Sequence, residues 1–169
     1  MCAPNTCTDG SSQVFQTLKM LSIANFDEYC WTSDTRNIFT RVSFDQFEGG
    51  FADFTFKDKT GNFAAFLARH GGRAAAVLDQ SQVTWHCEVK STKNSLTTEP
   101  FNLSQNQLNM ARAHTFAAQQ SISHVYVILH VFDMPSDRPA LRAYVDPWKM
   151  FVDGKLILHA EGGYQCCEA

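Results

Sequence analysis

The chain has 169 residues, of which 44% are hydrophobic and 18% charged, and its formal net charge is −3. This composition is typical of one globular domain with a sizeable core, and it excludes a disordered or fibrous chain. The negative balance also argues against a protein that coats nucleic acid through bulk charge. No apolar stretch approaches the ~18 residues of a membrane span, and residues 1–12 lack the pattern of a secretory signal. We therefore expect an intracellular protein, nuclear or cytoplasmic, without a membrane partner.

The hydrophobic pattern predicts one domain over residues 11–159, between flexible tails at 1–10 and 160–169. Its expected elements, in chain order, are a helix at 11–23, strands at 37–44, 51–57 and 62–68, a short helix at 74–76, a strand at 83–90, a helix at 104–120, strands at 124–132 and 141–145, a turn or short helix from 146, and a strand at 155–159. The second and third strands are expected to form a hairpin, because the residues between them favour a turn. This order predicts an α/β fold, a mixed β-sheet flanked by helices.

Two segments give the firmest local signals. Ser104 and Gln107 have the S-x-x-Q spacing of a capping box, which predicts the start of a helix. The segment 124–132 is almost wholly apolar, as expected for a central strand buried on both faces. His130 within it is expected to be a hydrogen-bonded core histidine. His114, on the predicted helix, is assigned no function.

The six cysteines lie mainly toward the two ends of the chain: Cys2, Cys7, Cys30, Cys87, Cys166 and Cys167. They are not spread out as in a disulfide framework, and they do not form the two close pairs of a zinc site. We expect free thiols. A metal site or disulfides formed by the tails is the alternative.

The predicted strand at 83–90 separates polar from apolar side chains. Since side chains alternate along a strand, one face receives polar residues and the other receives apolar ones: His86, Glu88 and Lys90 against Trp85, Cys87 and Val89. Asp53 lies in a Phe-rich strand, where aspartate is disfavoured. If the two strands are neighbours, Asp53 and Glu88 converge near Lys90. Two carboxylates suit Mg²⁺ or Mn²⁺, which can acidify water and offset charge on a phosphodiester; an exposed Glu–Lys pair without a role is the alternative.

The order Asp…Glu-x-Lys on neighbouring strands resembles the signature of the PD-(D/E)XK, or restriction-endonuclease-like, superfamily. Within it, the chain resembles the family of the domain at the C-terminus of the plant protein NO VEIN, which includes many fungal members. The matching segments, in order, are 31–33 (WTS) followed by Arg36, 51–54 (FADF), 87–92 (CEVKST), 99–101 (EPF) with Ser104, and 144–147 (YVDP). The resemblance covers residues 11–158 and implies a restriction-endonuclease-like core.

The resemblance also implies roles by position. Asp53 and Glu88 would be ligands of Mg²⁺ or Mn²⁺, together with the backbone carbonyl of Val89, and Lys90 would be the catalytic lysine. Three further residues are candidates for substrate contact: His86, Gln105 and Gln107. The alternatives are a strand histidine without a role for His86 and capping alone for Gln107.

The chain departs from the family at its first helix, where many members have a Gly-Glu pair and Ser11 here follows Gly10. Two hypotheses follow. One is a metal-dependent nuclease that hydrolyses phosphodiester bonds of nucleic acid. The other is a non-catalytic module of the same fold that binds nucleic acid or protein. Nucleases of this fold often pair, so a homodimer is one state open to the chain, although its sequence carries no interface pattern.

Overall fold

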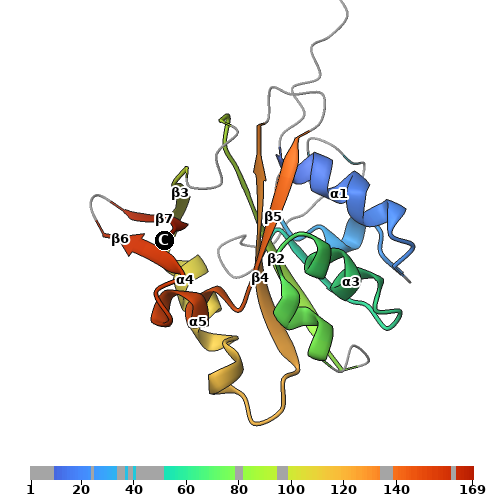
Figure 1. The fold of residues 1–169 in the computed structure, drawn as a ribbon. Helices are drawn as coiled ribbons and strands as arrows, with labels where there is room; N and C mark the ends of the chain where they lie inside the picture. The colour runs from blue at the N-terminus through green and yellow to red at the C-terminus, as the bar shows by residue number, and fades with distance from the viewer. Residues whose placement is uncertain are drawn as a thin grey trace, which may run out of the picture.

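The computed structural model describes residues 10–23, 25–33, 37, 40, 52–78, 82–94, 99–133, 139–160 and 163–169. Its elements in chain order are α1 (Gly10–Met20), η1 (Glu28–Cys30), β1 (Phe54–Lys57), α3 (Asn62–Arg69), η3 (Arg73–Val77), β2 (Thr84–Ser91), β3 (Phe101–Leu103), α4 (Gln105–Ala113), η4 (Phe116–Ala118), β4 (His124–Phe132), β5 (Ala140–Val145), α5 (Pro147–Val152), β6 (Leu156–His159) and β7 (Tyr164–Glu168). They form a four-stranded sheet in the order β1-β2-β4-β5 and a three-stranded sheet in the order β3-β7-β6 (Figure 1).

The larger sheet is mixed, which confirms the predicted α/β class. Strand β2 pairs with β4 in parallel, whereas β1 and β5 pair antiparallel to β2 and β4 respectively. Every residue of β4 between its two ends is buried, as its apolar sequence predicts. The connection between β2 and β4 contains β3 and α4, so this crossover places α4 against the sheet.

The two faces of this sheet are covered by different layers (Figure 1). Helices α1 and α3 pack on one face, where the apolar side chains of β2 join an aromatic core. Helices α4 and α5 and the smaller sheet lie on the other face, around Tyr126 and Ile128 of β4. In β2, the side chains of Trp85, Cys87 and Val89 all belong to the first core, which confirms the predicted division of this strand.

Segment 62–68 is a helix, α3, and the predicted strand and hairpin are wrong. The turn before it forms as expected, with Gly61 at φ 78°. However, the buried carboxylate of Asp58 accepts a 2.8 Å hydrogen bond from the backbone N–H of Phe63 and so satisfies a free donor at the helix start. The buried side chains of α3 then recur at helical spacing, at Phe63, Ala64, Phe66 and Leu67.

Two further boundaries differ from the prediction. The helix expected over 104–120 ends at Ala113, and the turn after it is held by tertiary contact, since Asp146 accepts a 3.0 Å hydrogen bond from the N–H of Phe116. The flexible tail expected over 160–169 contains β7, which pairs with both β3 and β6. Apart from Asn37 and Thr40, the strand predicted at 37–44 lies outside the described residues.

Within the described ranges, no helix is both long enough and apolar enough to cross a membrane. The four cysteines that these ranges contain are free thiols: Cys30, Cys87, Cys166 and Cys167. Cys2 and Cys7 lie outside them.

Candidate active site

Strands β1 and β2 are neighbours, which is the condition on which the predicted approach of Asp53 to Glu88 depends. Phe54 pairs with Cys87 in the antiparallel ladder, so Asp53, directly before β1, lies beside the next part of β2. The Asp53 carboxylate accepts a 2.7 Å hydrogen bond from the backbone N–H of Val89. The first predicted acid therefore reaches the residue that separates Glu88 from Lys90.

Glu88 and Lys90 lie on the face of β2 that α4 covers. The residue Glu88 is only 5% exposed, and its carboxylate lies 3.0 Å from the ammonium nitrogen of Lys90. A buried carboxylate needs such a partner, because removing it from water without one is costly. The pair is thus a buried ion pair and not the solvated Glu–Lys pair of the alternative reading.

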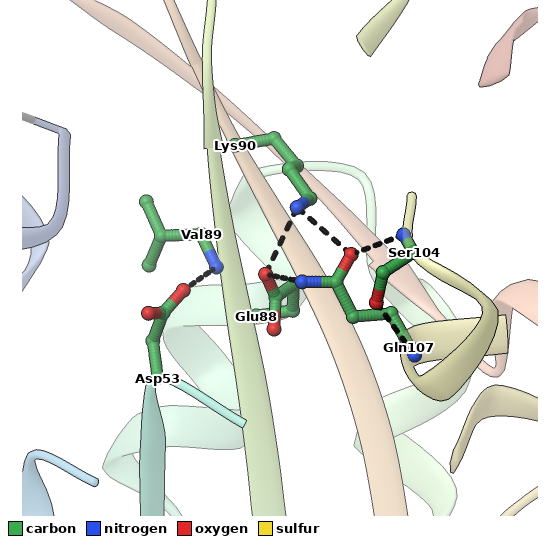
Figure 2. Close-up of polar contacts among 6 residues, drawn as sticks. All are labelled: Asp53, Glu88, Val89, Lys90, Ser104 and Gln107. Carbon is green, nitrogen blue, oxygen red and sulfur yellow. Dashed lines mark hydrogen bonds and ion pairs between the residues drawn. The ribbon is translucent and has the colours of Figure 1, made fainter. Parts of the chain in front are cut away.

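Gln107 completes this network from the first turn of α4. Its amide nitrogen donates a 2.5 Å hydrogen bond to Glu88, and its amide oxygen accepts a 3.0 Å bond from Lys90. The same oxygen accepts from the N–H of Ser104, whose hydroxyl accepts from the N–H of Gln107, so the predicted capping box is present. Figure 2 shows Asp53 on one side of β2 and the Glu88–Lys90–Gln107 network on the other, at the same level of the strand.

The negative charges of Asp53 and Glu88 affect the same two buried residues, Cys87 and Tyr126. Burial raises the pKa of the Cys87 thiol well above its usual value, and the negative charges of Asp53 and Glu88 raise it further. Burial likewise raises the pKa of the Tyr126 hydroxyl well above its usual range, with smaller contributions from Glu88 and Asp53. Cys87 is therefore a protonated, inert thiol, as its position predicts.

Two other predicted contact residues lie apart from this network. Gln105 is exposed, donates to Asn109 and accepts a 2.6 Å hydrogen bond from the hydroxyl of Tyr164. His86 projects from the same face of β2 as Glu88 but meets two other histidines, His114 and His124. Burial lowers the pKa of His86 to about 4, helped by the two neighbouring imidazoles.

The histidine cluster was missed at the sequence level. His114 directly follows α4 and His124 begins β4, so no spacing in the sequence relates them to His86. Only the packing of α4 on the sheet brings the three together. His130, by contrast, is the core histidine that was expected: it is wholly buried, and its ring lies 2.8 Å from the hydroxyl of Thr92.

Comparisons of this chain with protein-family models, with curated proteins and with solved structures find no match.

Gln107 both caps α4 and bonds Glu88 and Lys90, and we test this dual role by substitution. Gln107→Glu keeps the capping box, but it replaces the amide donor toward the buried Glu88 with a second carboxylate at a half-buried position. We expect it to lower the free energy of unfolding by about 1–3 kcal/mol, the cost of removing a hydrogen-bond donor from a buried polar group. Urea denaturation of both proteins measures the difference.

Gln105→Glu is the matched control, because it adds the same charge to the same helical turn at an exposed position. An acid in the first turn of a helix is neutral or mildly stabilising. Equal stabilities for the two variants would contradict a role of the Gln107 amide in holding Glu88.

Proposed function

We propose that this chain is a metal-dependent nuclease-like domain that hydrolyses phosphodiester bonds of nucleic acid, with Asp53, Glu88 and Lys90 at its site. One observation carries the proposal: the Asp53 carboxylate is hydrogen-bonded to the backbone between Glu88 and Lys90, 2.7 Å from the N–H of Val89. Asp53, directly before β1, thereby reaches the Glu-x-Lys segment of β2, although its side chain lies on the other side of that strand from Glu88. The resemblance to the NO VEIN C-terminal family within the restriction-endonuclease-like superfamily supports the same assignment.

The donor set fits a hard divalent cation. Carboxylate oxygens are the ligands that Mg²⁺ and Mn²⁺ prefer, and such ions are commonly held by one or two carboxylates plus water and substrate phosphate. Asp53 and Glu88 would hold the ion, with the carbonyl of Val89 as a third donor. When bound, the ion would acidify a water molecule and offset charge on the phosphate.

The other residues act through position and charge. Lys90 brings a cation to the site, where it can donate to an oxygen atom of the phosphate or orient the attacking water. Gln107 bonds both Glu88 and Lys90, which fixes the direction of each side chain. An intracellular location, nuclear or cytoplasmic, is supported by the free thiols among the described residues.

A non-catalytic nucleic-acid- or protein-binding module is the second candidate. It is favoured by the closed network itself, in which Glu88 and Lys90 already neutralise each other at 3.0 Å. The absence of an acid after Gly10, where Ser11 stands, favours it as well.

Calorimetric titration of Mn²⁺ into the parent, Asp53→Asn and the control Asp153→Asn tests the proposal. Asp153 is paired with Lys149 on the surface, so its variant removes the same charge away from the site. We expect Asp53→Asn to weaken Mn²⁺ binding by about 10-fold or more, because site charge sets the affinity for such ions. The control is expected to bind as the parent does.

The same proteins are then tested for cleavage of labelled DNA and RNA in the presence of Mg²⁺. The parent and Asp153→Asn are expected to cut one of these substrates, and Asp53→Asn to lose that activity. If the parent binds no Mn²⁺, the acids are a remnant of the fold and the second candidate replaces the first.

A further inference from the structure

Three histidines from separate elements meet on the face of the sheet that α4 covers. His86 lies within β2, His124 begins β4, and His114 directly follows α4. In the parallel ladder Thr84 pairs with His124 and His86 with Tyr126, so His86 and His124 are offset by two residues and share a face. One ring nitrogen from each of the three histidines lies within 4.8 Å of the other two.

The rings are packed and hydrogen-bonded. The centroids of His86 and His114 are 4.6 Å apart with nearly parallel planes, and each lies 5.3 Å from His124. His86 Nε2 is 3.0 Å from His124 Nδ1, and the other nitrogen of His86, Nδ1, is 3.5 Å from the hydroxyl of Thr55. His86 Nε2 and His124 Nδ1 are therefore connected by one hydrogen bond.

His86 and His114 are half-buried, and their ring nitrogens lie close to that of His124. A neutral imidazole has a nitrogen lone pair free for a metal, whereas a charged one does not. His124 is exposed, so the cluster opens to solvent on that side.

We propose that His86, His114 and His124 form a binding site for a divalent transition-metal ion of the zinc class. Imidazole nitrogen suits zinc, copper and nickel better than it suits Mg²⁺. A metal ion would replace the proton between His86 and His124, and the hydroxyl of Thr55 is placed to hold the second nitrogen of His86, as outer partners of metal-bound histidines do. Three protein ligands leave a further position for water or a substrate group, as in catalytic zinc sites.

This site is separate from the Asp53–Glu88 pair in both residues and ligand chemistry, and it does not rest on the proposed nuclease function. His86 and Glu88 are two positions apart on β2, which corresponds to about 7 Å along the strand. An ion at the histidines would therefore lie beside the carboxylate site without using its donors.

Zinc affinity, measured by competition with a chromophoric chelator, tests the site in the full chain. We expect His114→Ala and His124→Ala each to weaken zinc binding by about 100-fold or more, since loss of outer partners alone commonly costs 10–100-fold. His159→Ala, an exposed histidine on β6, is the matched control and is expected to bind as the parent does. Unchanged binding in both cluster variants, or no binding by the parent, would overturn the proposal.

Two further measurements exclude other sources of binding. The Co²⁺ complex of the parent is expected to show tetrahedral visible bands without a thiolate charge-transfer band; a thiolate band would place the metal on cysteine and overturn the proposal. Added zinc is expected to raise the Tm of the parent but not of His114→Ala, because only a ligand bound to the folded state stabilises it.

To show whether the two proposed metal sites are independent, zinc binding is measured in the acid variant and Mn²⁺ binding in the histidine variant. Glu88→Gln is expected to keep zinc binding, and His114→Ala to keep Mn²⁺ binding. If Glu88→Gln lowered the zinc affinity as much as His114→Ala does, the metal would be bound at one site centred on the acids. This result would overturn the proposed histidine site, while the nuclease proposal would stand. Loss of Mn²⁺ binding in Asp53→Asn with zinc retained in every acid variant would support both sites independently.

Discussion

Phe54→Ala is expected to lower the free energy of unfolding by about 3–5 kcal/mol, the usual cost of removing a buried aromatic ring. Phe54 is wholly buried, with its ring centroid 5.4 Å from Trp31, 6.2 Å from Phe15 and 6.3 Å from Phe26. Trp31 and Phe26 flank η1 and Phe15 belongs to α1, so the Phe54 ring connects β1 to two other segments of the first core. The cavity left by alanine would loosen all of them.

Urea denaturation followed by tryptophan fluorescence measures this loss. Tyr29→Ala is the matched control, because Tyr29 is 70% exposed and its ring is largely in solvent. We expect the control to change stability by about 0.5 kcal/mol or less, as surface substitutions usually do. A loss below about 1 kcal/mol in Phe54→Ala would show that the aromatic core does not depend on this ring.

Lys90→Met is expected to destabilise the fold by about 3 kcal/mol, because it removes the cation from a buried carboxylate. Glu88 has 7% of its side chain exposed and Lys90 has 17%, so solvent cannot replace the missing partner. Gln107 would still donate to Glu88, but the neutralising cation would be gone. Lys90→Met is also expected to abolish the proposed hydrolysis.

The double variant Glu88→Gln with Lys90→Met separates these two effects. Removing both charges leaves neither member of this pair as an uncompensated buried ion, so we expect it to recover most of the stability lost in Lys90→Met. Its hydrolysis should remain absent, because both chemical groups are gone. Additive losses in this cycle, measured by urea denaturation, would contradict a coupled buried pair.

Alternation along β2 is the feature that sequence predicts best. A strand divides its side chains strictly by parity, so the separation of Glu88 and Lys90 from Trp85 and Cys87 follows from spacing alone. The pairing of this strand with β1 was only one possibility at the level of the sequence, which instead favoured a hairpin between 51–57 and 62–68. The capping box at Ser104, like the alternation, is local.

Other features depend on contacts between segments far apart. The apolar residues of 62–68 suit either a strand or a helix, and the helix is supported by Asp58, which accepts a hydrogen bond from the N–H of Phe63 in its first turn. Strand β7 has Cys166 as its only fully buried side chain, too weak a pattern to mark a strand from sequence. The histidine cluster exists only because α4 packs over β2, and its members carry no shared motif.

Side chains at both ends of helix α4 contact side chains of strand β2. Gln107 in its first turn bonds Glu88 and Lys90, and His114 directly after its last turn stacks on His86. The helix has 9 residues, about 13 Å of length, and its middle is fixed by the buried Leu108 and Ala111. A motion that lifted α4 from the sheet would have to break the carboxylate network and the imidazole stack in one event. Complete detachment of α4 from the sheet is therefore expected to disrupt both places together.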